Sequence, residues 1–182
     1  MRIYEVNSRE GYEFCHPKED KDDFERINLL INGTERRQSW CQVNMRILTK
    51  DMGKQLLESD SPWLGSHALI FREQAVSVLY PLLSTNGELL PLACAEAKLS
   101  IYNPTKVLDG LDESASAATR FSSGRIMSIT RYVFKLEVVR DAEIFKLSCL
   151  RVSPTFVQQG FVDLWNASSL RGLHFRQVWD GD

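Results

Sequence analysis

Apolar and polar residues alternate along several stretches of the chain, and this alternation predicts β-strands. The clearest case is residues 40–48, WCQVNMRIL, in which every second residue from Cys41 to Ile47 is apolar. Such a segment buries one face against a core and exposes the other. Further strands are predicted at 2–6, 67–71, within 89–102, and at 125–129, 132–139, 142–147 and 173–179.

A different spacing, with apolar residues three or four positions apart, predicts a helix over residues 72–84. Its apolar positions are 75, 76, 79, 80 and 83. Pro81 is expected to kink or end this helix, because proline lacks the backbone N–H that a helix interior needs. Asn86-Gly87-Glu88 supplies a stop signal directly afterwards.

Two more helices are predicted. The longer covers residues 153–172, with Thr155 and Gln158 as a capping box and Gly172 just beyond the last turn. Gly160 inside it indicates close packing, since glycine costs about 1 kcal/mol relative to alanine in a helix. The shorter begins near Asp22 or Asp23 and is expected to turn both Leu29 and Leu30 inward.

These elements predict a single α+β domain over residues 1–182, mostly antiparallel sheet packed with a few helices and ending in a helix–strand unit. A length of 182 residues suits one domain. Residues 1–85 form the less regular part, and residues 86–180 carry the more recognisable pattern.

Charge and cysteine usage narrow the class of protein. The formal net charge is -2, which argues against nucleic acid as the main ligand. The four cysteines show neither CxxC nor zinc-ligand spacing, and the N-terminal residues MRIYEVNSRE contain no apolar leader. We therefore expect a cytoplasmic protein with reduced thiols. No apolar run approaches the roughly 20 residues of a membrane span, so no membrane association is expected.

The sequence contains no motif that indicates an enzyme. The only histidines are His16, His67 and His174. His67 and His174 are interpreted as partly buried or sheet-surface residues, and His16 precedes Pro17 in a charged loop. Residues 122–125, SSGR, have one glycine and indicate a hairpin turn rather than a phosphate-binding loop. No catalytic residue, metal site or cofactor is predicted.

One acidic stretch stands out, VLDGLDESASA at residues 107–117, with Asp109, Asp112 and Glu113 close together. Three interpretations stay open at this point. The acids form a turn and precede a short helix at 114–117, they are displayed to a partner, or two of them act as general acid and base. The spacing does not match a calcium-binding loop.

Several motifs in the second half resemble a family of presumed immunity proteins of bacterial polymorphic toxin systems, originally catalogued as a domain of unknown function. The similarity covers about residues 86–180. The residues that carry it are Asn103 with Val107, Asp109, Leu111, Asp112 and Ser114; Tyr132 and Phe134; Ile144-Phe145-Lys146; and Gly172, Leu173, Phe175, Val178 and Trp179.

The resemblance implies a non-catalytic protein that binds and neutralises a cognate toxin in the producing cell. Acidic residues are then expected to contact the toxin, first Asp109, Asp112 and Glu113. The second candidate is the charged loop with Glu19, Asp20, Asp22 and Asp23. The alternatives are a structural or regulatory interaction module, for which a homodimer is one option, and a small carboxylate-dependent enzyme.

Overall fold

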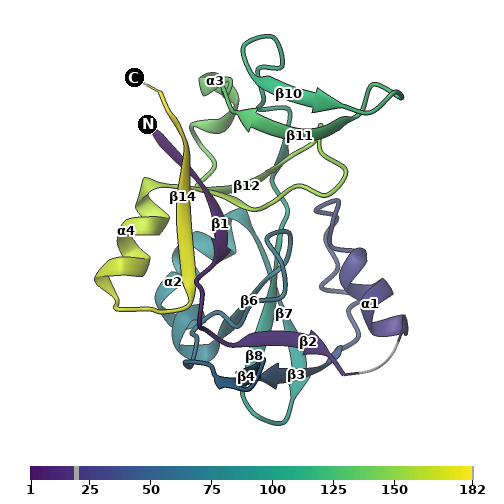
Figure 1. Ribbon diagram of the computed structural model, residues 1–182, viewed down its shortest axis with the longest axis vertical. Helices are drawn as coiled ribbons and strands as arrows, with labels where there is room; N and C mark the ends of the chain where they lie inside the picture. Colours follow the sequence, from purple (N-terminus) through teal and green to yellow (C-terminus); the bar gives the residue numbers. More distant parts are fainter. Residues whose placement is uncertain (19–20, 182) are drawn as a thin grey trace.

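Two five-stranded sheets form the body of the molecule in the computed structural model, which describes residues 1–18 and 21–181 (Figure 1). In the first sheet the order is β14 (Leu173–Asp180), β1 (Arg2–Ser8), β13 (Phe156–Gln158), β12 (Ile144–Leu147) and β9 (Val107–Leu108). In the second it is β2 (Phe14–Pro17), β3 (Asn44–Leu48), β7 (Gly87–Cys94), β8 (Leu99–Pro104) and β6 (Leu69–Arg72).

Two short hairpins complete the strands, β4 (Lys50–Asp51) with β5 (Lys54–Gln55) and β10 (Ala117–Arg120) with β11 (Ile126–Arg131). Pairing is antiparallel except between β3 and β7 and between β9 and β12. The predicted α+β class with mostly antiparallel sheet is confirmed. The first sheet joins the two ends of the chain, because β1 lies between β13 and β14.

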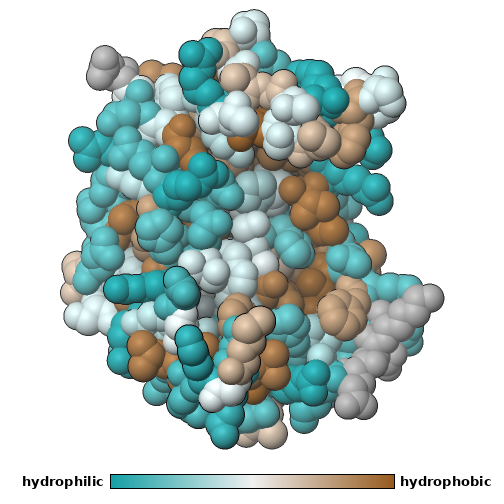
Figure 2. All heavy atoms as spheres, in the orientation of Figure 1, coloured by the Kyte–Doolittle hydropathy of each residue, from teal (hydrophilic) through white to brown (hydrophobic). Residues whose placement is uncertain are grey.

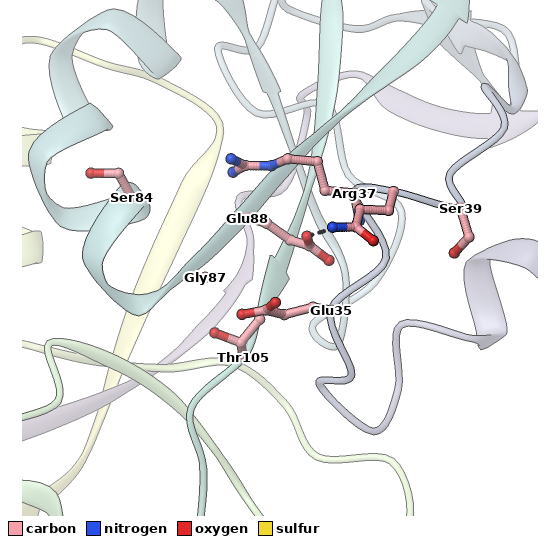
Figure 3. Close-up of a pocket in the computed structure, with 8 residues that line it drawn as sticks. Glu35, Arg37, Ser39, Ser84, Gly87, Glu88 and Thr105 are labelled. Carbon is pink, nitrogen blue, oxygen red and sulfur yellow. Dashed lines mark hydrogen bonds between the residues drawn. The ribbon is translucent and has the colours of Figure 1, made fainter.

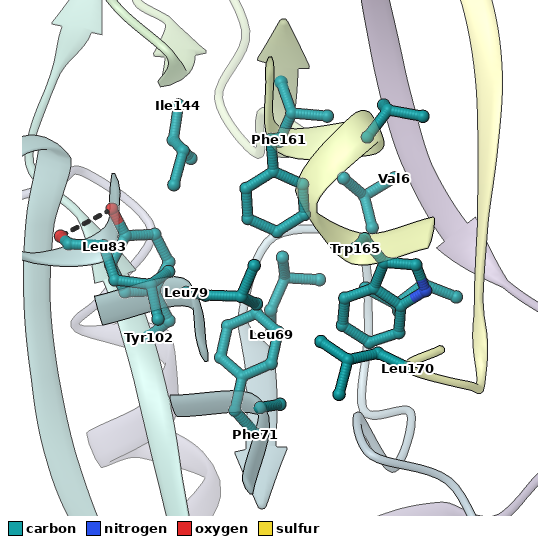
Figure 4. Close-up of a cluster of buried hydrophobic side chains, with 14 of the residues drawn as sticks. Val6, Leu69, Phe71, Leu79, Leu83, Tyr102, Ile144, Phe161, Trp165 and Leu170 are labelled. Carbon is teal, nitrogen blue, oxygen red and sulfur yellow. Dashed lines mark hydrogen bonds between the residues drawn. The ribbon is translucent and has the colours of Figure 1, made fainter. Parts of the chain in front are cut away.

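Helices α2 (Glu73–Asn86) and α4 (Gln159–Ala167) pack against each other between the two sheets, with α2 mainly on β6, β7 and β8 and α4 on β1 and β13. Their contact contains Leu79, Phe161 and Trp165, each at most 2% exposed (Figure 4). The helix predicted at 72–84 is confirmed, but Pro81 does not end it. The last turn is held by side chains instead: Thr85 donates to the Pro81 carbonyl and Asn86 to that of Leu82.

The prediction of one helix over 153–172 is wrong at its start. Residues 156–158 pair with β1 as strand β13, and helix α4 begins only at Gln159. The capping box does not form, because the Gln158 amide donates to the Val139 and Ala142 carbonyls. Close packing at Gly160 is confirmed, since a Cβ there would lie 3.1 Å from a Glu143 carboxylate oxygen.

The strand predicted at 132–139 does not form, since β11 ends at Arg131. Phe134 forms an isolated bridge with Leu111, and residues 136–139 then make the single helical turn α3 (Leu136–Val139). Phe134 packs on Phe145, Phe156 and Trp179 over the other face of the first sheet. The apolar residues that follow, of which Val139 is fully buried, make one turn of helix.

The N-terminal half needs two smaller corrections. Helix α1 (Lys21–Asn28) forms as predicted, but only Leu30 turns inward, whereas Leu29 is 50% exposed. Strand β3 begins at Asn44, later than the alternation suggested, and Cys41 is exposed. Val43 and Met45 are fully buried, so the predicted inner face of this strand is confirmed for these two residues.

Candidate functional site

The acidic segment, residues 107–114, runs from β9 into a turn, and its carboxylates are engaged by the protein's own chain. Asp109 accepts a hydrogen bond from the ammonium of Lys135 at 2.8 Å, and this bond raises the pKa of Lys135. Glu113 forms an ion pair with Arg120 on β10. Both carboxylates remain accessible, with 74% of the Asp109 side chain and 45% of the Glu113 side chain exposed.

Asp112 differs from its two neighbours because it organises the turn itself. Its Oδ1 accepts from the backbone amides of Ser114 and Ala115 and from the Ser114 hydroxyl, at 2.6 to 3.1 Å. These bonds favour the charged form and lower the pKa of Asp112, the Ser114 hydroxyl having the largest effect. The helix considered for 114–117 does not form, since the chain enters β10 at Ala117.

Leu111, between these acids, is 1% exposed and belongs to the core under α3. Backbone bonds fix the segment on both sides of it, from the Asp112 amide to the Val133 carbonyl and from the Lys135 amide to the Gly110 carbonyl. The three carboxylates therefore point to separate partners. The arrangement supports a shaped surface and gives no pair of carboxylates that face a common substrate.

The second set of predicted contact residues is only partly at the surface. Asp22 is exposed on α1, but Asp23 is 3% exposed and lies 3.4 Å from Arg26. Glu19 and Asp20 lie outside the described residues. Asp23 faces the protein rather than a partner, because it lies on the same face of α1 as the buried Ile27, four positions later.

The histidines and cysteines do not converge on a reactive centre. Burial lowers the pKa of His16 and of His67, and nearby cations (Arg46 and Lys146 respectively) lower each further. His174 is exposed on β14. Within residues 1–18 and 21–181, no three His, Cys, Asp or Glu side chains are grouped as ligands of a metal ion. All four cysteines are free thiols.

A polar groove of about 560 Å³ lies between the end of α2 and the loop at 35–39 (Figure 3). Its most buried side chain, Glu88 on β7, is 5% exposed. The Glu88 carboxylate accepts from the backbone amides of Arg36 and Arg37, at 2.6 and 3.0 Å, and from Asn103 Nδ2 at 2.8 Å. With three hydrogen bonds to its carboxylate, Glu88 holds the loop in place.

A second buried anchor was not found by sequence reasoning. Lys146 on β12 is fully buried, and its ammonium donates to the Leu30 carbonyl at 2.9 Å. Burial lowers the pKa of Lys146 to about 8. A lysine inside the apolar strand sequence IFKL was the available signal. Asn103 also donates to the Thr34 carbonyl, so Lys146 and Asn103 together hold the segment 30–37 from inside.

Comparison with known families agrees with the resemblance described above. Residues 99–180 match the sequence model of a family described as Immunity protein family (Imm11). The match begins at Leu99, later than the resemblance at 86 suggested, and it includes the acidic segment, Asn103 and Lys146. No curated protein matches the chain. Among the described residues, no helix has the length and apolar character needed to cross a membrane.

Proposed function

We propose, because residues 99–180 match the Imm11 immunity protein family, that this protein is an immunity protein of a bacterial polymorphic toxin system. It binds the cognate toxin in the cytoplasm of the producing cell and blocks it, which protects that cell during competition between bacteria. The family match is the observation that carries this proposal. The protein acts by binding and performs no catalysis of its own.

The arrangement of side chains supports inhibition by surface complementarity. An inhibitor needs a few well-packed contact residues and matching charge, and it needs no reactive group. Asp112 and Glu88 are each bonded within the protein. A carboxylate that accepts several hydrogen bonds within the protein stabilises the local structure.

Among the predicted acidic contacts, the exposed carboxylates Asp109, Glu113 and Asp22 are the ones we propose to reach the toxin. Glu19 and Asp20 stay in the proposal as sequence-based candidates. Asp112 and Asp23 are assigned instead to the support of their own segments, since Asp112 accepts three bonds in its turn and Asp23 is buried.

The experiment is co-expression with the toxin domain encoded beside this gene. We expect the toxin domain alone to stop growth of the host cell, and the wild-type protein to restore growth and to be recovered with the tagged toxin domain. The matched control is a toxin domain from an unrelated locus, which the protein should neither bind nor neutralise. Failure of the wild type to bind or to restore growth contradicts the proposal.

A further inference from the structure

Three hollows on the surface share lining residues and so form one continuous strip. The first is lined by Arg26, Leu29, Arg36, Ser39, Trp40 and Cys41. The second repeats Leu29 and Arg36 and adds Ile31, Arg151 and Val152. The third repeats Arg151 and adds Phe121, Arg125, Ile126 and Cys149. We call this surface the arginine strip; it joins the end of α1, the β12–β13 loop and the tip of the β10–β11 hairpin.

The charge of the arginine strip has one sign. Four arginines line the three hollows, and among the described residues no aspartate or glutamate does. Arg26 is the one of the four that pairs with an acid, the buried Asp23. Arg36, Arg125 and Arg151 have no ion pair with any carboxylate of residues 1–18 and 21–181. The Arg36 Nε is also buried, and no acceptor within this part of the chain bonds to it.

Some arginines elsewhere on the molecule pair with acids. Arg72 lies 2.8 Å from Glu13, Arg176 pairs with Glu5, and Arg120 pairs with Glu113. Each of these has its charge balanced within the protein. The strip therefore keeps several guanidinium groups available for carboxylates from outside, and guanidinium binds carboxylates in a two-pronged geometry that lysine does not match.

Apolar side chains lie among these arginines with much of their surface exposed. Leu29 is 50% exposed, and Phe121 and Val152 are 49% exposed each. The Arg125 guanidinium lies 5.7 Å from the centre of the Phe121 ring, so the aromatic face and the charge form one contact unit. Figure 2 shows apolar surface gathered on the right-hand side, between the hairpin at the top and α1 below it.

The backbone beneath the strip is held from inside the protein. Lys146 bonds to the Leu30 carbonyl next to Leu29, and the Asn103–Glu88 pair holds the amide of Arg36. The β12–β13 loop is fixed by Ser153, whose hydroxyl accepts from the Leu147 amide and donates to the Pro154 carbonyl. A surface built in advance loses less conformational entropy when a partner binds, and so binds more tightly.

We propose that the arginine strip is the surface through which this protein docks an acidic patch of its toxin. The partner surface presents carboxylates to Arg36, Arg125 and Arg151, and an apolar side chain of the partner packs among Leu29, Val152 and Phe121. Arginine and aromatic residues dominate the energetics of protein interfaces, which fits this combination. The inference rests on the proposed function, and it names the chemistry of the partner at that site.

The experiment measures the affinity of the purified toxin domain for the full-length wild type and for the variants Arg151→Glu and Val152→Asp. Arg171→Glu is the charge-matched control, because Arg171 is exposed in the α4–β14 connection, on the side of the molecule away from α1 (Figure 1). Tyr80→Asp is the apolar control, since Tyr80 is 57% exposed on α2. Thermal melting checks that each variant folds.

We expect Arg151→Glu and Val152→Asp each to weaken toxin binding at least about tenfold. The variant that combines the two substitutions should weaken it about a hundredfold, whereas the two controls should bind within about twofold of the wild type. The association rate of the wild type should fall as salt is raised, and that of Arg151→Glu should be lower and less sensitive to salt. Both positions are exposed, so the melting temperatures are expected to change little.

The outcomes separate the two proposals. A wild type that does not bind the toxin domain overturns the proposed function and the docking surface together. A wild type that binds, with strip variants that bind as tightly as the controls, overturns the docking surface alone. Binding of the strip to an RNA or DNA fragment instead, or a dimer in light scattering that only the strip variants dissociate, also overturns it.

Discussion

In the acidic segment the apolar side chain is buried and the charges are satisfied, whereas in the arginine strip the apolar side chains are exposed and the charges are available. Leu111 is 1% exposed and Asp109 bonds to Lys135, but Leu29 is 50% exposed and Arg151 has no ion pair within the described residues. The difference teaches that the acidic motif residues, although recognisable in the sequence, mainly stabilise the fold. The surface proposed to dock the toxin is formed by other residues nearby.

The two regions lie near each other, since Glu113 pairs with Arg120, which is next to Phe121 of the third hollow. Burial raises the pKa of Cys149 in that hollow, and the charges of Glu113 and Asp109 raise it further. A toxin seated on the strip therefore lies near the exposed acids, which act at the rim of the contact. Charged groups at a rim influence the association rate more than the final affinity. The acidic segment and the arginine strip can therefore be compared by measuring toxin binding and stability for variants of each.

The largest expected effect concerns two leucines, one from each region. Leu111→Ala removes a fully packed side chain and should lower the free energy of unfolding by about 2–5 kcal/mol. Leu29→Ala, at a half-exposed position, should change it by less than about 0.5 kcal/mol. Urea unfolding followed by circular dichroism measures both. A Leu29→Ala variant as unstable as Leu111→Ala would show that the strip belongs to the core.

The next effect comes from Lys146, whose pKa of about 8 lies below its ordinary value of 10.5. The unfolded chain holds the proton up to about pH 10.5, but the folded chain releases it near pH 8, so stability should rise with pH between these values, by about 3 kcal/mol. Lys146→Met removes this rise, because methionine has no group that titrates in this range.

The effect of Lys146 is isolated by subtracting the free energy of unfolding of Lys146→Met from that of the wild type at each pH. Burial raises the pKa of Cys15 and of Tyr132 to about 12 each, and these groups lower the stability of both proteins as the pH rises toward that value. Their contribution cancels in the difference. Equal pH profiles of urea unfolding for Lys146→Met and the wild type would contradict the assignment of a shifted lysine.

A smaller loss is expected from Asn103→Ala, which removes the amide that bridges Glu88 and the Thr34 carbonyl. The Thr34 carbonyl then lacks this donor and Glu88 keeps only its two amide donors, which should cost about 1–3 kcal/mol. Because the loop carries Arg36, toxin affinity should fall as well, and hydrogen exchange of the Arg36 amide should speed up. If the Arg36 amide exchanges at the wild-type rate in this variant, Asn103 does not help to hold the loop that carries Arg36.

The smallest effect is expected for the exposed acids. Asp109→Lys combined with Glu113→Lys should weaken toxin binding about threefold, because each carboxylate is solvated and already paired within the chain. Binding is measured beside Arg151→Glu, with melting temperature as the check on folding. A loss larger than that of Arg151→Glu would reverse the order and place the main contact on the acidic segment.

Much of the fold was predictable because local spacing reports burial. The alternation in β1 and in the inner face of β3, the apolar stripe of α2 and the hairpin turn with Gly124 at a positive φ all follow from residues near one another in the chain. The motif residues of the second half likewise indicated the immunity protein family without any structure.

Where prediction failed, contacts from distant parts of the chain decided the outcome. Residues 156–158 continue the pattern of a helix, but pairing with β1 makes them a strand. Residues 132–139 alternate like a strand, but Phe134 makes only an isolated bridge with Leu111 and packs on Phe145, Phe156 and Trp179. A local pattern carries no information on which distant strand offers free hydrogen-bonding groups, and these groups outweigh weak helix propensity.

By itself the sequence determined the α+β class, most strands, helix α2 and the family resemblance, because these depend on near neighbours and on residue order. Only the tertiary structure decided that Asp112 holds a turn, that Lys146 and Asn103 support a segment far away in the chain, and that three separated segments meet in the arginine strip. The physical reason is that burial and charge pairing belong to the assembled molecule, since each depends on side chains that only folding brings together.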